Sequence, residues 1–509
     1  MKMKSLILTL FLGTTLPLFA QQTSFVNQQL VTVRVTYQSW NEYRPWQKAQ
    51  PGSRRFFGIV LSGHRILVLA DYLEDATLIQ VEKFDRPPRH PAHIIHCDPQ
   101  VNLALITVDD PAFFEDLKPI EVAPKLQGNK FSCANWRSGQ LVAASCRFSH
   151  IASRRNYTPY FRYPGIYFIT DLKNGGRGEP LLDPKNNLAG ITVRQTNNQI
   201  VVLPAQVIQA YLKAVARPTY PKFAQLGVNW QFNRGPAQAT YLGLKGTPRG
   251  IRIQSTLAEG SAAGILKPND LLLELDGNPI DCQGDYRHPQ YGWIDFKLIA
   301  NDGHIAGDVI TAKVLRDGKE LDLKIPLKNI PPSADLIPTT RHNQPPPYLL
   351  AGGLVFRELD MPYLRAWGDG WQQNIPTRLR IHLEMDAQTQ GENRRLIILT
   401  DVFPDQYNLG YHDLSQLIVT KVNHKTIRSI ADMEEAFNHP IGDFHLIEFS
   451  PGLTLSKIVL DAKTFKAATK RIMKTYQIPH RLRLRKPAPS DVAKLLPRAT
   501  KSPRPASSL

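Results

Sequence analysis

The chain has 509 residues, 42% of them hydrophobic and 21% charged, and its formal net charge at pH 7 is +18. This length exceeds a single ordinary core and predicts about three domains, and the composition excludes a chain that is disordered throughout. A balance this basic favours an anionic partner such as nucleic acid, anionic lipid or an acidic cell wall.

The first twenty residues have the pattern of a secretory signal peptide. Lys2 and Lys4 precede the apolar run 6–12, and the small residue Ala20 stands before Gln21. The apolar run is shorter than the roughly 20 residues that a membrane anchor needs. We therefore predict a signal peptide at 1–20 and an exported protein, periplasmic or extracellular, for which we expect no nucleic-acid partner.

Residues 21–215 carry short apolar runs at close spacing and little helical periodicity. Many short strands of this kind predict an all-β barrel or sandwich. A single helix over 204–215 is expected to close the domain. The clearest of the strand-like runs are 30–35, 65–69, 103–108 and 188–193.

The rest of the chain divides into two mixed domains, a linker and a tail. Residues 216–330 and 348–485 each combine strand-like and helical patterns, which predicts two smaller α/β domains. The proline-rich stretch 331–347 predicts an extended linker. The end, 486–509, together with the basic residues just before it, predicts a disordered basic tail. Such a tail is either simply solvated or in contact with an anionic envelope surface.

Four cysteines are too few for a disulfide-rich scaffold, and their spacing fits no zinc site. We accordingly predict no metal and no cofactor. Cys133 and Cys146 are symmetric about Gly139 and Gln140, and a hairpin turn at those two residues would make the cysteines a non-hydrogen-bonded pair. Because such a pair brings its Cα atoms close together and an exported protein is oxidised, we predict a Cys133–Cys146 disulfide.

Four segments, in order, resemble the trypsin-like domain of the HtrA/Deg protease family, most closely its plant-type branch with two PDZ domains. They are 58–61, 66–71, 98–105 and 174–181. The resemblance implies a mainly β protein, with a trypsin-like double β-barrel followed by two PDZ-like α/β domains. It also implies homo-oligomers, as trimers or multiples of trimers. Aromatic residues of the N-terminal segment are candidates for that interface, with packing on their own barrel as the alternative: Phe25, Tyr37, Trp40, Tyr43 and Trp46.

Each of the later domains has a glycine-apolar loop where the family's carboxylate-binding loop lies. Such a loop at a strand start exposes backbone amides that receive a peptide's C-terminal carboxylate, while the peptide adds to the sheet edge. The resemblance therefore implies that both domains bind peptides or protein C-termini, the first of them better. The predicted peptide-binding residues are Leu226, Gly227 and Val228 in the first PDZ-like domain and Gly353, Leu354 and Val355 in the second.

The resemblance places the family's catalytic triad on residues unsuited to serine-protease chemistry. The general-base histidine falls on Asp71, the orienting aspartate on Asn102 and the nucleophilic serine on Arg177. We therefore predict that the chain is not an enzyme but a pseudoprotease, acting as a peptide-binding scaffold or quality-control adaptor. Two alternatives stay open: an active serine endopeptidase with a relocated site, and a cell-envelope adhesion protein with a basic surface. In the cleft, Asp71 and Arg177 should either form an ion pair or leave Arg177 pointing into solvent.

Overall fold

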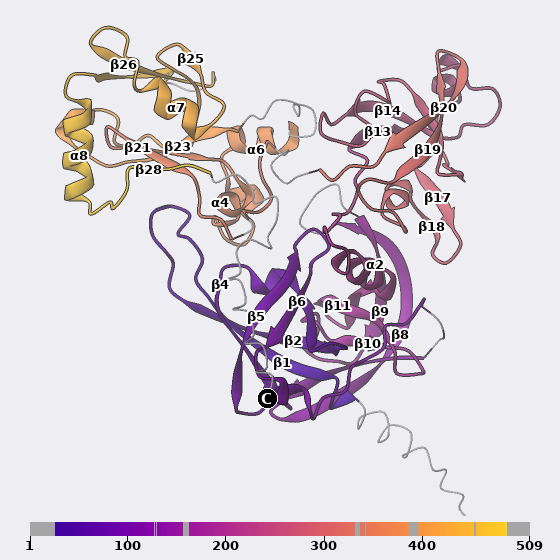
Figure 1. The fold of residues 1–509 in the computed structure, drawn as a ribbon. Coiled ribbons are helices and arrows are strands. Elements are labelled where there is room, and N and C mark those ends of the chain that lie inside the picture. Colours follow the sequence, from indigo (N-terminus) through magenta and orange to yellow (C-terminus); the bar gives the residue numbers. More distant parts are fainter. Residues whose placement is uncertain are drawn as a thin grey trace, which may run out of the picture.

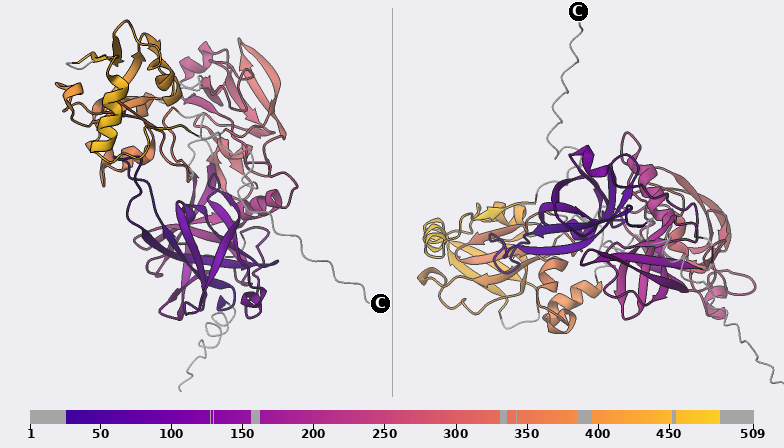
Figure 2. Two further views of the ribbon diagram at one scale, coloured as in Figure 1. Left: turned by 60° about the vertical axis from the view of Figure 1, so that its left-hand side comes forward. Right: turned by 90° about the horizontal axis from the view of Figure 1, so that it is seen from below.

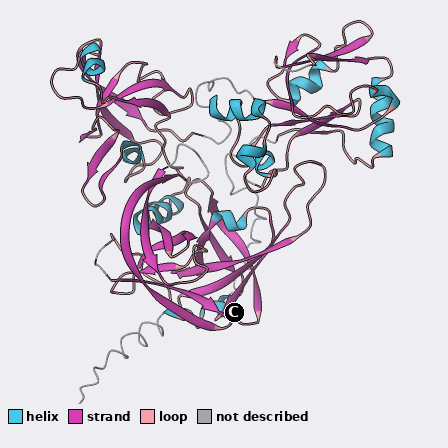
Figure 3. Cartoon of the chain, turned by 180° about the vertical axis from the view of Figure 1, so that it is seen from behind, coloured by secondary structure: helices cyan, strands magenta, loops and turns pink. Residues whose placement is uncertain are grey.

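The computed structural model describes residues 26–126, 128, 130–155, 162–330, 336–341, 343–385, 395–451 and 455–485. The predicted signal peptide, Phe25 and the predicted basic tail lie outside these ranges. Strands predominate in each of the three domains, and the helices are few and short (Figure 3). No helix within the described ranges is long and apolar enough to cross a membrane.

The first domain consists of two closed β-barrels, which confirms the predicted trypsin-like double barrel (Figure 1). The strand order is β1-β2-β3-β6-β5-β4 in the first barrel and β10-β11-β12-β9-β8-β7 in the second. The helix α2 closes the domain, as predicted. The elements are β1 Leu30–Tyr37, β2 Gly52–Leu61, β3 Arg65–Leu69, η1 Ala70–Leu73, β4 Ala76–Lys83, β5 Arg89–Asp98, β6 Leu103–Val108, η2 Pro111–Phe114, β7 Phe131–Arg137, β8 Gln140–Arg155, β9 Arg162–Thr170, β10 Pro180–Leu182, β11 Leu188–Thr196, β12 Gln199–Pro204 and α2 Ala205–Val215.

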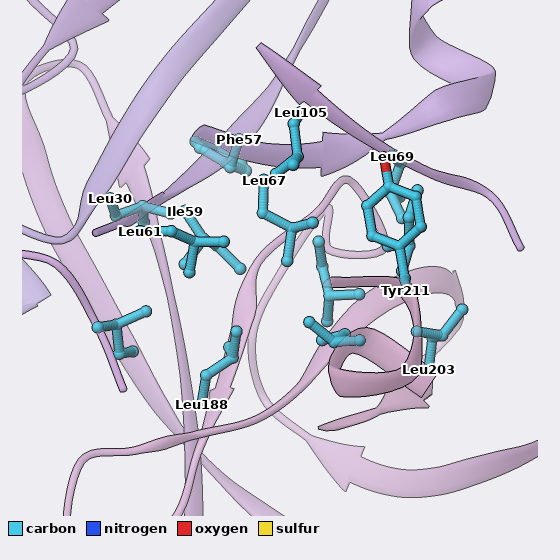
Figure 4. Close-up of a cluster of buried hydrophobic side chains, with 14 of the residues drawn as sticks. Leu30, Phe57, Ile59, Leu61, Leu67, Leu69, Leu105, Leu188, Leu203 and Tyr211 are labelled. Carbon is cyan, nitrogen blue, oxygen red and sulfur yellow. The ribbon is translucent and has the colours of Figure 1, made fainter. Parts of the chain in front are cut away.

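Strand β2 contributes to two cores at once. Its apolar end is buried on both faces, because successive side chains of a strand point to opposite sides. Phe56 packs inside the first barrel, whereas Phe57 faces the second. Figure 4 shows this second cluster, in which Leu188 comes from the second barrel and Tyr211 from α2. Each fully buried Leu or Phe contributes about 1.5–3 kcal/mol, so this shared core holds the two barrels in a fixed relation.

The second domain is built on a sheet whose strand order is β13-β14-β15-β19-β20, with β13 at one edge. Strand β16 pairs with β15, and β17 and β18 form a separate hairpin. The elements are β13 Val228–Phe232, α3 Pro236–Tyr241, β14 Ile251–Thr256, β15 Leu271–Leu275, β16 Asn278–Pro279, β17 Asp285–His288, β18 Gly292–Asp295, η3 Phe296–Ala300, β19 Val309–Arg316 and β20 Lys319–Pro326.

The third domain has a larger sheet, in the order β27-β26-β24-β23-β22-β21-β28, with β25 paired to β24. Leu336 and Ile337, in the predicted linker, pack against α4 and α6, so part of that linker belongs to the core of this domain. The elements are β21 Tyr348–Ala351, β22 Leu354–Glu358, α4 Met361–Arg365, α5 Trp371–Asn374, α6 Thr377–Met385, β23 Ile397–Val402, η6 Gln406–Asn408, β24 Leu417–Val422, β25 Lys425–Thr426, α7 Ile430–Ala436, β26 Phe444–Phe449, β27 Lys457–Asp461, α8 Phe465–Thr475 and β28 Leu482–Arg483.

Both later domains lie on the same side of the barrel domain (Figures 1 and 2). The connection between β1 and β2, residues 38–51, extends from the barrel to the third domain. There Trp46 packs on Phe403, with ring centroids 5.7 Å apart, and the Tyr43 hydroxyl donates to the Ala366 carbonyl (3.0 Å). These two aromatic residues therefore form an interface within one chain, in place of the oligomer contact or barrel packing that the sequence suggested.

Candidate functional site

The structure brings the three predicted triad positions close together in the barrel domain. Asn102, in the left-handed region at φ 58°, accepts a hydrogen bond on its side-chain oxygen from the backbone amide of Asp71 (2.9 Å). The next residue, Tyr72, points its hydroxyl at the Gly176 carbonyl (3.4 Å). Burial and the charge of Asp71 raise the pKa of Tyr72 to about 12, and the charge of Arg177 opposes that shift. The charges of Asp71 and Arg177 thus both affect the pKa of the Tyr72 hydroxyl.

Asp71 and Arg177 do not form the ion pair considered above. The Arg177 side chain is exposed, and among the ion pairs of the described residues none joins it to Asp71. The second alternative, an arginine directed into solvent, is the one observed.

The loop that carries Arg177 is hydrogen-bonded to a buried carboxyl group, that of Glu179. The sequence analysis did not single out this residue. Glu179 is fully buried, and its Oε2 accepts from the Arg177 amide (2.8 Å) and from the Thr192 hydroxyl. Burial raises the pKa of the Glu179 carboxyl, and the hydrogen bonds from Thr192 and Arg177 oppose that shift. The sequence could have indicated this residue, because Glu179 stands where the resembling segment of the family has a second glycine.

Two backbone amides of the same loop are engaged inside the protein. The Arg177 amide bonds Glu179, and the Gly175 amide bonds the side-chain oxygen of Gln195. In a serine protease, amides at the nucleophile and just before it stabilise the oxyanion of the tetrahedral intermediate. Here both donate to neighbouring side chains, so an oxyanion would have to displace Glu179 and Gln195.

The second domain presents the predicted loop at the start of an edge strand. Leu226, Gly227 and Val228 lead into β13, which pairs with β14 on one side only. The Leu226 carbonyl accepts from the Ala262 amide (3.1 Å). Gly227 has φ +68°, and a Cβ there would lie 2.8 Å from the Gly260 Cα, so only glycine fits. The structure therefore places all three predicted residues beside an open sheet edge.

An aromatic residue missed by the sequence analysis lines the space between β13 and η3. Trp230, two residues after Val228, lies edge-on to Phe296, with ring centroids 5.5 Å apart. The Lys297 amine lies 5.6 Å from the centre of the same ring. Side chains of a strand alternate between its two faces, so Trp230 lies on the same face as Val228. This alternation could have identified Trp230 from the sequence.

The third domain does not present its predicted loop at an open edge. Gly352 and Gly353 form the turn between β21 and β22, and β22 pairs with β21 on one side and β23 on the other. The Gly352 amide donates to the Thr469 hydroxyl (2.9 Å), and the Gly353 carbonyl accepts from the Phe403 amide (2.8 Å). Strand β22 therefore has a partner on each side where these residues lie, and the assignment of peptide binding to Gly353, Leu354 and Val355 stays a prediction.

The two candidate disulfide cysteines meet in the second barrel, by a different register from the predicted one. Strand pairing sets Cys133 opposite Ala144 and Cys146 opposite Phe131, and the turn lies at Ser138 and Gly139, both with positive φ. The cysteines are therefore diagonal neighbours on one face, with their Sγ atoms 2.9 Å apart and both side chains buried. The disulfide stays a prediction. Within the described residues no cluster of three or more His, Cys, Asp or Glu side chains could hold a metal ion.

The fold and these sites define a class of protein: a trypsin-like double barrel followed by PDZ-like domains. A family model described as PDZ domain matches residues 337–482. Protease Do-like 2, chloroplastic, of Arabidopsis thaliana is 23% identical over 476 residues, which cover 91% of this chain and 76% of the relative. Protease Do-like 4, mitochondrial, of the same plant is 24% identical over 477 residues, covering 89% of this chain and 85% of the relative. These matches support the HtrA/Deg family for this chain.

Solved structures of the family align with part of the chain. The structure titled HtrA-type protease AlgW with decapeptide covers 62% of this chain and 99% of its own, with 18% sequence identity and a TM-score of 0.46.

The relatives correct one prediction made from the sequence. Proteins named as proteases match nearly the whole chain, so the prediction that the chain is not an enzyme is contradicted by the activity of its family. The geometry specifies something narrower: positions 71, 102 and 177 hold an aspartate, an asparagine and an arginine. The assignment of the triad to these three positions stays a prediction.

Proposed function

We propose that this HtrA/Deg-family chain captures extended peptides or protein C-termini along the free edge of β13, and that it serves as a binding scaffold or quality-control adaptor in an exported compartment. The observation that supports this proposal is the one-sided pairing of β13 directly after the Leu226–Val228 loop. PDZ domains bind peptides by adding them as a strand at such an edge.

The register of β13 indicates which backbone groups a peptide would meet. Trp230 stands opposite Ile253 of β14. The Ile253 amide donates to the Asp270 carbonyl (2.8 Å), and the Ile253 carbonyl accepts from the Asn269 amide (2.9 Å). Both groups of Ile253 therefore point away from β13. In an antiparallel pair the opposite residue then also points outward, so the amide and carbonyl of Trp230 face the open edge.

The side chains along this edge favour an apolar peptide end. Trp230 and Phe296 line the space between β13 and η3, and Leu226 and Val228 flank the glycine of the loop. A last residue with an apolar side chain would be buried against these groups while its carboxylate meets the loop amides. Internal peptide segments lack that carboxylate and are expected to bind more weakly.

The test compares Trp230→Pro with Trp230→Ala in the chain from residue 21 onward. Both variants lose the indole ring, but only proline also removes the outward amide. With labelled peptides that end in Val, Leu or Phe, we expect Trp230→Pro to bind roughly tenfold more weakly than Trp230→Ala. Amidating the peptide C-terminus should weaken binding to the wild type by a similar factor.

Equal binding by the two variants, with matching thermal unfolding curves, would remove β13 from the proposal. Equal binding of free and amidated peptides would remove the carboxylate loop. The same samples serve to measure casein hydrolysis and fluorophosphonate labelling, with and without peptide. A labelled residue would identify the nucleophile that positions 71, 102 and 177 do not supply.

Assembly as trimers or multiples of trimers is part of the same proposal, on the strength of the family. Tyr43 and Trp46 are engaged with the third domain, so an oligomer interface would use other residues. Light scattering that shows only monomer at micromolar concentration would contradict assembly.

A further inference from the structure

A cavity of about 310 Å³ lies between the barrel domain and the second domain. One wall is the outer face of α2, and the opposite wall is the β17–β18 hairpin together with the segment 301–308. In Figure 1 this hairpin lies on the side of the second domain nearest α2. None of the predicted catalytic or peptide-binding residues lines the cavity.

The wall formed by α2 carries positive charge. Lys213 lies in the last turn of the helix and Arg217 follows just after it, and both line the cavity with exposed side chains. Neither takes part in an ion pair among the described residues. Arg162, which also lines this side, is already paired with Asp295 (3.4 Å). Two cations of this wall therefore have charge available for a ligand.

The wall formed by the second domain carries acids and aromatic rings. Asp302 accepts from His288 Nε2 (2.8 Å), and that imidazole stacks on Tyr291, with ring centroids 4.4 Å apart. Asp302 lies close enough to Tyr286 and Tyr291 for its charge, after burial, to raise the pKa of both hydroxyl groups. A second carboxylate, Asp308, lines the same wall.

The two walls face each other with opposite charges but do not join. Within the described part of the chain, no ion pair connects Lys213 or Arg217 to Asp302 or Asp308. Opposite charges that are separated by an unfilled, partly buried space gain little from each other, because their attraction falls with distance and with solvent screening. An occupant that carries one charge of each sign would interact with both walls at short range.

We propose that this cavity binds a short zwitterionic peptide of two or three residues. Its carboxylate lies toward Lys213 and Arg217, its ammonium group toward Asp302 and Asp308, and an aromatic side chain packs on the tyrosines of the second-domain wall. A volume of about 310 Å³ is at the lower end of the range for ligand pockets, which suits a ligand of this size.

The cavity is a different place from the β13 edge. The short helix η3 separates the two: its Phe296 contacts Trp230 beside β13, whereas its Leu298 lines the cavity. The proposal therefore does not depend on peptide capture at β13, and the two sites can be tested apart.

The test uses isothermal titration of the chain from residue 21 with the dipeptide Gly-Phe. Three blocked forms serve as matched ligands: N-acetyl-Gly-Phe, Gly-Phe-amide and N-acetyl-Gly-Phe-amide. We expect Gly-Phe to bind, each single block to weaken binding at least about tenfold, and the doubly blocked form to show no binding, since a tenfold change corresponds to the loss of one charge-assisted contact.

Two double variants assign the charged ends. Lys213→Ala with Arg217→Ala should weaken Gly-Phe by about tenfold but leave the weak binding of Gly-Phe-amide unchanged, because that ligand has no carboxylate to lose. Asp302→Asn with Asp308→Asn should act in the same way on the ammonium end. Lys185→Ala, an exposed lysine elsewhere on the barrel domain, is the control and should bind Gly-Phe like the wild type.

Three outcomes would overturn the proposal. They are no binding of Gly-Phe to the wild type, equal binding of the doubly blocked dipeptide, and unchanged binding by both double variants. Loss of Gly-Phe binding in Trp230→Pro would also overturn it, because that result would place the dipeptide at the β13 edge.

Discussion

The second and third domains are both PDZ-like, yet their sheet edges differ. In the second, β13 pairs on one side only and follows directly on a glycine loop. In the third, the corresponding glycines lead into β22, which has a partner on each side. One of the two outermost strands there, β27, is capped: the Tyr411 hydroxyl accepts from the Val459 amide (3.3 Å) and donates to its carbonyl (3.4 Å). Strand addition needs an exposed edge, so the PDZ-like fold alone does not fix how a domain is used.

The third domain uses its surface to bind the barrel domain of its own chain. Glu42, from the β1–β2 connection, pairs with Arg341 and with the fully buried Arg357 (3.1 Å). Arg357 also pairs with Asp360 (3.0 Å), and the two arginines hold the pKa of Asp360 below its usual range in spite of burial. At the other end of the sheet, Arg483 donates to the Pro45 carbonyl (2.8 Å). The second domain thus presents an open sheet edge, whereas the third domain binds the β1–β2 connection of the barrel domain.

The largest expected effect comes from breaking that anchor with Glu42→Ala. The change leaves two buried guanidinium groups with Asp360 as their remaining carboxylate, and removing one partner of a buried ion-pair cluster costs about 3–5 kcal/mol. We expect a lower melting temperature and faster proteolytic separation of the third domain, measured by thermal unfolding and limited proteolysis. Peptide binding at β13 should be unchanged.

The control for this variant is Glu259→Ala, which alters an exposed glutamate of the second domain. If Glu42→Ala matched this control in melting temperature and in cleavage pattern, the cluster would not be what anchors the third domain. If it abolished peptide binding at β13 while the chain stayed folded, the two domains would not have the separate uses described here.

A second prediction concerns the stability of the barrel domain, which we expect to be independent of peptide capture by the second domain. Cys133 and Cys146 lie in the second barrel with their Sγ atoms 2.9 Å apart. In the oxidised protein we expect a disulfide that closes a short loop, which stabilises by about 3 kcal/mol. A non-reduced digest analysed by mass spectrometry should contain the linked peptides, and reduction should lower the melting temperature of the barrel domain without altering peptide capture. Free thiols at both positions in the oxidised sample would refute the prediction.

Sequence patterns sufficed where the information is local. The runs 30–35 and 103–108 predict β1 and β6, observed at Leu30–Tyr37 and Leu103–Val108, because a mostly buried strand shows in the sequence as a short run of consecutive apolar residues. The loop at Leu226–Val228 was predicted at a strand start from its position in the family pattern, and it does lead into β13. The Cys133 hairpin was one residue out at the turn, since Ser138 with Gly139 and Gly139 with Gln140 are both acceptable pairs to a reader of the sequence.

The rest depended on partners far along the chain. Gly352 and Gly353 fit a carboxylate-binding loop as well as a hairpin turn, and the difference is made by Asn408 and Thr469, which bond Gly352 from 56 and 117 residues away. The anchoring of the third domain likewise joins Glu42 to Arg357 across 315 residues. Local periodicity in the sequence does not predict such long-range pairings. It also does not predict a cavity that forms between two domains.

The smallest effect is expected from uncapping β27 with Tyr411→Phe. The substitution keeps the ring but removes the hydroxyl that bonds both backbone groups of Val459, so it should cost about 1 kcal/mol per lost hydrogen bond. An exposed edge also favours pairing between copies, so light scattering should show more concentration-dependent association than in the wild type. Tyr241→Phe, at a tyrosine that is 89% exposed, is the matched control. Unchanged unfolding and association in Tyr411→Phe would mean that the hydroxyl does not protect the strand.

Combining Tyr411→Phe with Trp230→Pro asks whether an open edge is enough to bind a peptide C-terminus. Tyr407 caps the same strand at the Asp461 carbonyl, so Tyr407→Phe is added to expose the whole edge. In this triple variant the β13 edge is blocked and the β27 edge is open, so any remaining binding would take place at an edge that does not follow the Leu226–Val228 loop. We therefore expect peptides with free and amidated ends to bind equally weakly in a fluorescence polarisation assay. A preference for the free carboxylate would show that the loop before β13 is not needed, and that the open edge alone accounts for the difference between the two domains.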